Sequence, residues 1–362
     1  MSDRRPARIA ALVGGLSAAH LDGLLLTGLS NIRYLTGFSG SSALLVVTPR
    51  DVVLITDFRY QTQVAAEVGD LARVAIESFS LWTGLWQQLA AHPALMVIGF
   101  ETAHIQHRDF QRLLEAGARW QWRPTLDLVE TLRERKDDDE IEAIRAAAGV
   151  ATRALGNTLP QIKAGLSELE VAGILEKALR DEGSEGFPFP SIVASGERSA
   201  LPHARTSARQ IAKGDLLLMD FGAEVGGYCS DLTRTVVVGK ASEEQRATYE
   251  VVRLANERAA RGVRAGMTGR DADAIARQYI ERAGYGDLFG HSLGHGIGLE
   301  VHEAPRLART AEGALGEGAV VTIEPGVYRP GWGGVRIEDD VVLAADGPQT
   351  LTQFPRELIE LG

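Results

Sequence analysis

The chain has 362 residues, of which 45% are hydrophobic and 24% are charged, proportions typical of a globular rather than a disordered protein. Its 48 acidic and 38 basic residues give a net charge of -10, which disfavours nucleic acid or an anionic membrane as a main partner. Cys229 is the only cysteine, so no intramolecular disulfide can form, and a reducing, cytoplasmic location is expected. The length predicts two domains, each with its own core.

The N-terminal residues combine a short helical pattern with a strand. Ile9, Leu12 and Leu16 repeat at helical spacing, and residues 21–26 form the next apolar run. We therefore expect a folded segment here and not a cleaved signal peptide, although arginines precede it. No apolar stretch approaches the roughly 20 residues that span a bilayer.

Short apolar runs alternate with helical patterns over about the first 130 residues. The predicted strands are Asp22–Thr27, Ala43–Thr48, Val52–Thr56 and Met96–Phe100, and the helical patterns lie around Arg59–Val68, Leu85–Ala91 and Arg108–Ala116. This alternation predicts a small α/β domain. Because a dense charge cluster at 133–140 then leads into a helix, we place the domains at 1–132 and 133–362.

The second region opens with two long helical patterns, at 140–157 and 167–182. Ser167 and Glu170 fit a capping box at the start of the second pattern. Glycine-rich β segments follow, interrupted by helices expected at about 243–264 and 270–283. All of the candidate chemistry lies in this region.

Two β-like runs separated by Gly226 and Gly227 each carry one acid. Asp220 lies in the first run, Asp231 lies in the second, and the glycines between them predict a hairpin. If the turn centres between Val225 and Gly226, Asp220 faces Asp231 with Cβ atoms about 5 Å apart. Two carboxylates this close favour either a shared proton or a bound cation.

A second pair of runs, 320–324 and 335–338, repeats the arrangement around a turn rich in glycine and proline. Pairing centred on Gly331 sets Glu324 opposite Glu338. An edge strand with outward-facing acids would explain either hairpin alone. Two such hairpins in one region favour a shared cation site.

Between the hairpins lies a glycine-rich segment, 291–303, that holds three of the eight histidines: His291, His295 and His302. Glycines leave room for an imidazole, the commonest metal ligand, to approach a metal or a substrate. A lone histidine would more often be a hydrogen-bonded core residue. Beside four placed carboxylates, a metal centre is the better interpretation.

Together these features resemble the Xaa-Pro peptidases, prolidase and aminopeptidase P, which belong to the pita-bread metallopeptidases. The similar segments are residues 195–203, 219–222, 230–235, 294–298, 322–328 and 335–339. Residues 31–38 and 56–60 resemble the creatinase/prolidase-type non-catalytic domain, which short methionyl aminopeptidases lack. The resemblance covers nearly the whole chain and implies a small N-terminal α/β domain followed by a pita-bread (α+β) catalytic domain.

The resemblance implies that two divalent metal ions are held by five side chains, Asp220, Asp231, His295, Glu324 and Glu338, with Asp231 and Glu338 bridging the ions. Oxygen-rich ligation favours Mn²⁺, with Co²⁺ and Zn²⁺ as alternatives. Two such ions can share one water, lower its pKa and present hydroxide to a scissile carbonyl. The resemblance also implies that Glu324 is the general base.

Further residues are expected to surround the substrate. His203 and His302 would stabilise the oxyanion or hold the substrate. The Xaa-Pro bond lacks an N–H and needs a dedicated pocket, for which Tyr328 and His291 are candidates. An ordinary strand-end aromatic is the alternative for Tyr328.

Two residues are expected to orient the carboxylates. Arg336 lies two positions before Glu338 and therefore on the same strand face. Thr233 lies in the segment around Asp231 that resembles the family, and we expect the same supporting role for it.

The substrate length depends on which cation meets the peptide's C-terminal carboxylate. Arg306, Arg33 and Arg59 are candidates, with a solvated surface arginine as the alternative for each. We expect an Xaa-Pro dipeptidase that acts on proline-containing peptides, with aminopeptidase P as the alternative. A non-catalytic peptide-binding protein of the same fold is a further alternative. The family also implies a homodimer.

Overall fold

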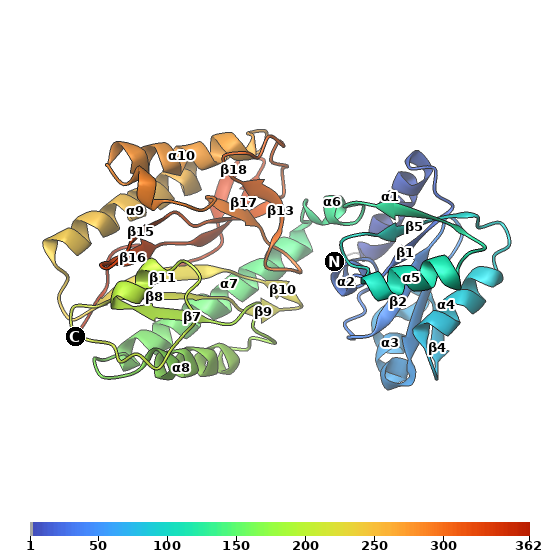
Figure 1. Cartoon of the computed structure of the whole chain (residues 1–362), viewed down its shortest axis with the longest axis horizontal. Coiled ribbons are helices and arrows are strands. Elements are labelled where there is room, and N and C mark those ends of the chain that lie inside the picture. The colour runs from blue at the N-terminus through green and yellow to red at the C-terminus, as the bar shows by residue number, and fades with distance from the viewer. Residues whose placement is uncertain (1–2) are drawn as a thin grey trace. The chain divides into compact units, whose positions relative to one another are not determined.

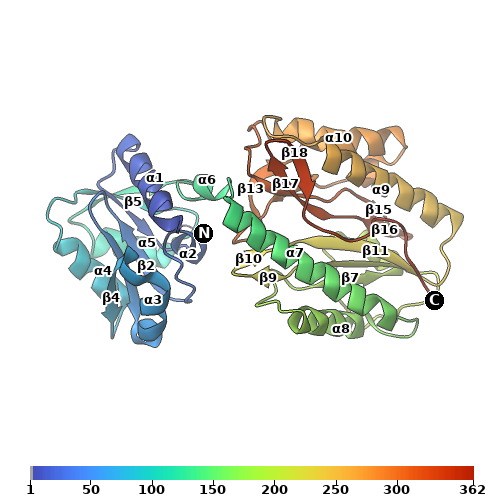
Figure 2. The ribbon, with the colours of Figure 1, turned by 180° about the vertical axis from the view of Figure 1, so that it is seen from behind.

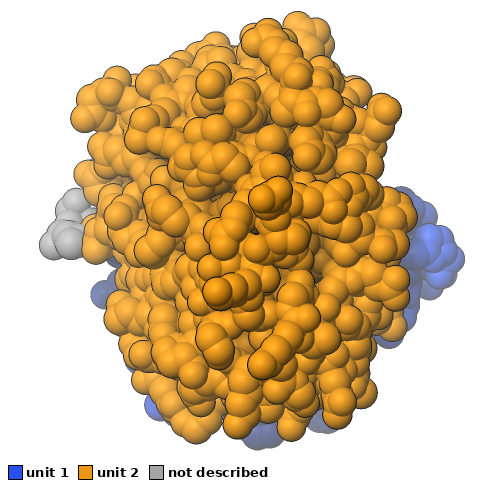
Figure 3. Space-filling view, turned by 90° about the vertical axis from the view of Figure 1, so that its left-hand side faces the viewer, with its two compact units in different colours: residues 1–133 blue, residues 134–362 orange. Residues whose placement is uncertain are grey.

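A computed structural model describes residues 3–362, which fall into two compact units that divide between Arg133 and Glu134 (Figure 3). None of the helices formed by residues 3–362 combines the length and the hydropathy needed to cross a bilayer.

The N-terminal unit is built on one mixed six-stranded sheet in the order β4-β3-β2-β1-β5-β6. Helices lie on both faces of this sheet (Figures 1 and 2). The strands are β1 (Gly23–Leu26), β2 (Ala43–Val47), β3 (Val52–Asp57), β4 (Arg73–Glu77), β5 (Val97–Glu101) and β6 (Gln121–Thr125). The helices are α1 (Arg5–Ala18), α2 (Leu29–Thr36), α3 (Gln61–Val68), α4 (Leu81–Ala90), α5 (His107–Glu115) and α6 (Glu130–Arg133).

The predicted α/β character of this unit is confirmed, but two strands were missed. Strands β4 and β6 form the two edges of the sheet and contain no buried residue. Edge strands need no apolar alternation because solvent replaces one neighbour. Their sequences, with Arg73 in β4 and Pro124 in β6, therefore lack the pattern that predicted β1, β2, β3 and β5.

A buried carboxylate joins β5 to α2 in this unit. Glu101 accepts hydrogen bonds from the backbone N–H groups of Thr27 at 2.6 Å and Gly28 at 2.8 Å. The side-chain amide of Asn31 donates to both Glu101 and Glu130 at 2.6 Å. Glu101 therefore binds the backbone N–H groups of the two residues that precede α2, whose N-cap, Gly28, has no side chain.

The C-terminal unit contains two helical hairpins that each cover one sheet. The helices are α7 (Asp138–Thr158), α8 (Glu168–Asp181), α9 (Glu243–Gly262) and α10 (Gly269–Arg282), all close to the predicted positions. The predicted capping box is confirmed, since Ser167 and Glu170 satisfy each other's backbone N–H groups at the start of α8.

The first sheet, in the order β19-β11-β8-β7, packs against α7 and α8 through one apolar cluster. The second sheet, in the order β13-β12-β14-β17-β18, packs against α9 and α10 through another (Figure 1). Short ladders β9-β10 and β15-β16 complete the unit. The strands are β7 (Ile192–Ser195), β8 (Leu216–Phe221), β9 (Glu224–Val225), β10 (Tyr228–Cys229), β11 (Leu232–Val238), β12 (Gly294–Gly296), β13 (Glu303–Leu307), β14 (Val320–Ile323), β15 (Gly326–Arg329), β16 (Gly333–Arg336), β17 (Asp339–Ala344), β18 (Gly347–Thr350) and β19 (Glu360–Leu361).

The register predicted for the first acidic hairpin was wrong by two positions. Thr233, and not Asp231, pairs with Asp220 across β8 and β11. The reason is the turn, because Gly226 and Gly227 both adopt positive φ, at 60° and 78°, and together form the two-residue loop. A shift of two keeps the face of each side chain, so Asp231, just before β11, still lies on the same side as Asp220.

The register predicted for the second acidic hairpin is confirmed. Val327 pairs with Val335 in the β15-β16 ladder, and Ile323 pairs with Asp339 in the β14-β17 ladder. Both ladders share one register, in which Glu324 and Glu338 occupy opposing positions where the first ladder ends and the second begins.

Candidate metal centre

A cavity of about 770 Å³ lies in the C-terminal unit and is lined by residues from both of its sheets. Most of the side chains singled out from the sequence line it: His203, Asp220, Asp231, His291, His295, His302, Arg306, Glu324, Arg336 and Glu338. These residues span more than 130 positions of sequence, so the fold brings them together.

Strand alternation places the first two acids. Leu217 and Met219 of β8 pack into the apolar cluster with α7 and α8, so Asp220 points to the opposite face. Leu232 and Val236 of β11 pack into the same cluster. The segment that carries Asp231 therefore presents this acid on the cavity side.

Two glycines allow His295 to reach the cavity from β12. A Cβ atom on Gly294 would lie 1.9 Å from the carbonyl oxygen of Thr322, and one on Gly296 would lie 2.0 Å from that of Ala304. Only glycine permits β12 to approach both neighbouring strands this closely.

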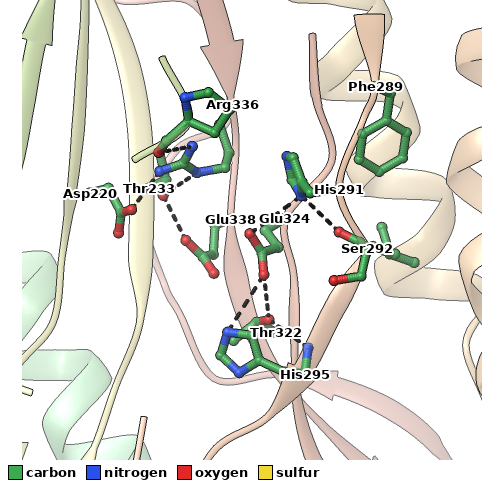
Figure 4. Close-up of polar contacts among 12 residues, drawn as sticks. Asp220, Thr233, Phe289, His291, Ser292, His295, Thr322, Glu324, Arg336 and Glu338 are labelled. Atoms are coloured by element: carbon green, nitrogen blue, oxygen red, sulfur yellow. Dashed lines mark hydrogen bonds and ion pairs between the residues drawn. The ribbon is translucent and has the colours of Figure 1, made fainter. Parts of the chain in front are cut away.

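The proposed ligand atoms converge (Figure 4). Asp231, His295 and Glu338 each offer one ligand atom, and these three atoms all lie within 4.8 Å of one another. Nε2 of His295 lies 3.5 Å from Oε1 of Glu324, as Figure 4 shows. The same nitrogen lies 3.8 Å from Oδ2 of Asp231. These nitrogen–oxygen distances are too long for good hydrogen bonds between the side chains, but they fit ligands that bind the same cation.

The chemistry of this donor set fits divalent cations. Oδ1 of Asp220 and Oδ1 of Asp231 are buried and have no hydrogen-bond partner among residues 3–362. Burial, followed by repulsion from Glu338, raises the pKa of Asp231 well above its usual range. Burial, followed by repulsion from Glu324, does the same to the pKa of Glu338. A cation relieves both the desolvation and the repulsion, so the residues present fit the expected metal.

The imidazole of His295 is also prepared as a ligand. Burial lowers its pKa to about 4, so the ring is neutral at pH 7. Nδ1 lies 2.9 Å from the carbonyl oxygen of Gly296 and must donate to it, which leaves the lone pair on Nε2 facing the acids. The tautomer that binds a metal is therefore set by the backbone of β12.

Arg336 and Thr233 support the acids from behind (Figure 4). Nη2 of Arg336 donates to Oδ2 of Asp220 at 2.5 Å, and its Nε donates to Oγ1 of Thr233 at 3.1 Å. Oγ1 of Thr233 in turn donates to Oε2 of Glu338 at 2.6 Å. Arg336 therefore contacts Asp220 directly and is linked to Glu338 through Thr233.

The remaining histidines line different parts of the cavity. His291 is partly buried, and burial lowers the pKa of its ring to about 4. His203 and His302 are exposed at the open side of the cavity. The rings of His295 and His302 lie 4.4 Å apart between centroids, and burial and the charge of His203 lower the pKa of His302.

Tyr328 lies behind the cavity lining and not at its surface. Its hydroxyl accepts a hydrogen bond from Nη1 of Arg336 at 2.8 Å and lies 2.9 Å from Nε2 of His291. Because burial raises its pKa to about 12, the hydroxyl stays protonated. Its hydroxyl therefore contacts the cavity lining through His291 and Arg336.

The three candidate arginines lie in different parts of the chain, and one of them, Arg306, lines the cavity. Arg306 is exposed and lines the cavity, and it pairs with His295 across β12 and β13. Arg33 lies in α2 of the N-terminal unit. Arg59 also belongs to that unit, where its guanidinium binds Asp57 at 2.7 Å.

An apolar part of the lining was not anticipated from the sequence. Phe189, Pro190, Ile192, Pro202 and Val301 line the cavity beside the polar residues. The run Phe187-Pro188-Phe189-Pro190 between α8 and β7 is the signal that could have indicated it, since two prolines within an aromatic run interrupt both helix and strand.

Comparisons with known proteins agree with this geometry. Residues 142–345 match the family model for metallopeptidase family M24, and residues 8–135 match the creatinase/prolidase N-terminal domain. The chain is 41% identical to an uncharacterized peptidase of Bacillus subtilis over 94% of this chain and 96% of that protein.

Two solved structures extend the likeness to the fold. An Xaa-Pro dipeptidase from Bacillus anthracis matches with a TM-score of 0.95 and 40% identity over 99% of this chain and 100% of that one. An X-Pro aminopeptidase from Thermotoga maritima matches with a TM-score of 0.89 and 37% identity over 97% of this chain and 99% of that one.

Proposed function

The chain belongs to metallopeptidase family M24, within its Xaa-Pro peptidases, and from this premise we propose that it hydrolyses the Xaa-Pro bond of dipeptides with a pair of divalent metal ions. The family and the fold establish a metal-dependent peptidase with the pita-bread catalytic domain. The observation that carries the finer proposal is the convergence of four carboxylates and one neutral imidazole on one cavity.

The ions would be held by Asp220, Asp231, His295, Glu324 and Glu338. The set carries about four negative charges, which two divalent ions would neutralise, and its oxygen-rich composition favours Mn²⁺ over Co²⁺ or Zn²⁺. When bound, such ions act as Lewis acids and lower the pKa of water. Metal analysis tests the number, with two ions per chain expected and one or none against the proposal.

Glu324 is the proposed general base. Burial raises its pKa to about 8, against the opposing effect of Arg336. A general base works best when its pKa lies near the working pH, because a useful fraction is then deprotonated and still basic enough to accept a proton. Glu324 is therefore suited to take a proton from the attacking water. Its Oε1 accepts a hydrogen bond from Oγ1 of Thr322 at 3.3 Å, which restrains the carboxylate in the cavity.

His203 and His302 are proposed to hold the scissile carbonyl. Both line the open side of the cavity, where an imidazole N–H can donate to the oxygen as negative charge develops on it. His291 and the apolar residues Phe189, Ile192 and Val301 are proposed to enclose the apolar parts of the substrate, including proline.

Arg306 supports the preference for dipeptides. In a dipeptide the C-terminal carboxylate is attached directly to the proline, so the cation that binds it must lie close to the metal ligands. Arg306 meets this condition because it pairs with His295 across β12 and β13 and lines the cavity. The other two candidates, Arg33 and Arg59, belong to the N-terminal unit.

A comparison of kcat/KM for an Xaa-Pro dipeptide and the matching Xaa-Pro tripeptide tests the preference. The proposal predicts faster cleavage of the dipeptide. Faster cleavage of the tripeptide would instead assign the chain as an aminopeptidase P, which the likeness to the X-Pro aminopeptidase from Thermotoga maritima favours. The cavity of about 770 Å³ is large enough for either substrate.

A further inference from the structure

Glu168, the first residue of α8, is a carboxylate that the reaction does not use and that is 0% exposed. Its Oε1 accepts hydrogen bonds from the backbone N–H and the hydroxyl of Ser195, both at 2.8 Å. Its Oε2 accepts the backbone N–H of Ser207 at 3.0 Å and the hydroxyl of Ser207 at 2.6 Å. Nε of Arg198 lies 3.2 Å from both oxygens. Every acceptor position of the side chain is thereby engaged.

Helix capping does not explain this burial. Ser167 is the N-cap of α8, and Glu170 completes the capping box, so the start of the helix is already satisfied. A carboxylate is also expensive to bury and is retained only where several donors compensate it. The donors here come from outside the helix.

These donors flank the loop that carries His203. Ser195 ends β7, Arg198 lies in the following short helical turn, and Ser207 lies beyond His203 in the chain. Nη2 of Arg198 donates a hydrogen bond to the carbonyl oxygen of Arg205 at 2.5 Å. The buried carboxylate of Glu168 therefore forms hydrogen bonds with both ends of the 195–207 segment.

The loop between these ends has little structure of its own. Residues 201–207 belong to no helix or strand, and His203 at their centre is exposed to the cavity. On the cavity side the loop is held by Nη1 of Arg336, which donates to the carbonyl oxygen of Pro202 at 3.2 Å. Fixing a loop residue costs conformational entropy, so a well-placed imidazole needs such anchors.

We propose that Glu168 is a positioning residue for His203, which sets the place of this imidazole in the cavity by anchoring both flanks of the 195–207 segment. The consequence for catalysis rests on the role proposed above for His203.

The first test observes His203 without any turnover. The ring signals of ¹³C-labelled histidine are recorded for the Zn²⁺-loaded protein, since Zn²⁺ is diamagnetic, and His203 is assigned by loss of its signal in His203→Ala. Glu168→Gln keeps the side-chain shape but removes the charge that pairs with Arg198. We expect it to shift or broaden the His203 signal.

Glu170→Gln is the matched control. It makes the same substitution two residues away on α8, in the capping box, where the side chain of Glu170 forms hydrogen bonds with Ser167. We expect it to leave the His203 signal unchanged. An unchanged His203 signal in Glu168→Gln, or an equal change in both variants, overturns the proposal.

The second test is a double-mutant cycle on Xaa-Pro hydrolysis. Glu168→Gln alone should lower kcat/KM by about ten- to hundredfold through misplacement of His203. In the His203→Ala background the same change should have no further effect, because its target is gone. Losses that multiply would show that Glu168 acts through general stability and would overturn the proposal.

The two tests separate the inference from the proposed function. If the protein does not cleave Xaa-Pro bonds, the proposed function fails while the ring signals still decide about Glu168. Should Glu168→Gln not fold, Arg198→Ala breaks the link to Arg205 from the other end and is expected to give the same two results.

Discussion

Four ionisable side chains in the cavity, all of them proposed metal ligands, have pKa values far from their ordinary values. Burial raises the pKa of Glu324 to about 8, and it also raises the pKa values of Asp231 and Glu338 well above their usual range. Burial lowers the pKa of His295 to about 4. In the metal-free site Glu324, Asp231 and Glu338 therefore tend to keep their protons at neutral pH, and metal binding must release those protons.

Replacing Asp231 or Glu324 with alanine should abolish Xaa-Pro cleavage and leave the fold largely intact. Each acid is buried against others of like charge, so its loss removes a ligand or the base but also relieves repulsion. Steady-state rates and the melting temperature of the metal-free protein test this together. Full activity in either variant would refute the assignment.

The metal-free protein should lose stability as the pH rises from about 6.5 to about 8. A carboxyl group whose folded-state pKa is raised binds its proton more tightly in the folded protein, so unfolding is favoured as pH rises toward that pKa. Glu324 covers this window, with a pKa raised from 4.5 to about 8. The depressed pKa values of His291 and His295, about 4, act in the opposite direction only below about 6.5.

Thermal unfolding with a chelator present, at pH 6.5 and at pH 8, measures this effect. A lower melting temperature at pH 8 is expected, and Mn²⁺ should reduce the difference because it displaces the protons. A melting temperature that is equal or higher at pH 8 in the chelated protein would show that these acids are ionised without metal.

Arg306→Met should raise KM for an Xaa-Pro dipeptide by about tenfold or more and change kcat little. The arginine is expected to bind the carboxylate in both the ground state and the transition state, a loss worth about 1.5–3 kcal/mol for a charged hydrogen bond. An Xaa-Pro tripeptide should lose less. An equal KM for the dipeptide in both proteins would remove Arg306 from the substrate site.

At the scale of elements, the site depends on how closely strands approach. Gly294→Ala should weaken metal binding more than it weakens the fold, because its Cβ would meet the carbonyl oxygen of Thr322 at 1.9 Å and push β12, with His295, away from β14. Calorimetric titration with Mn²⁺ tests this. Gly290→Ala is a suitable control, since a Cβ there meets no atom within 4 Å.

The sequence predicted elements that depend on local patterns, such as helices. It did not predict features that depend on the conformation of a turn, such as the register of the first hairpin. The helices of the C-terminal unit follow from apolar periodicity and capping residues such as Ser167. The register of the second hairpin followed from its turn, but that of the first did not, because two glycines at positive φ moved the turn by one residue. Periodicity says nothing about which residue pair occupies a turn.

Some side chains of the site could be identified from the sequence, and others could not. Asp220, Asp231, His295, Glu324 and Glu338 stand out because acids and histidines are unusual in apolar or glycine-rich strands. Glu168 carries no such signal, since an acid in the first turn of a helix is ordinary. Its role depends on Ser195, Arg198 and Ser207 folding back on it, which only the tertiary structure shows.

At the scale of the whole molecule, every proposed metal ligand belongs to residues 134–362. Binding of Mn²⁺ should therefore slow hydrogen exchange in the strands of the C-terminal unit that carry or directly flank the ligands, β8, β11, β12 and β16 among them. Exchange in β1 to β6 should change little. Mass spectrometry of peptic fragments measures both, and equal protection in the two units would contradict a site confined to one of them.

The central claim is a metal-dependent peptidase that selects proline at the second position. The most direct test is the rate at which the metal-stripped protein cleaves an Xaa-Pro dipeptide and the matching Xaa-Ala dipeptide, before and after addition of Mn²⁺. We expect no cleavage of either before addition and cleavage of the Xaa-Pro dipeptide alone afterwards. Cleavage that is independent of metal, or a rate on Xaa-Ala equal to that on Xaa-Pro, would contradict it.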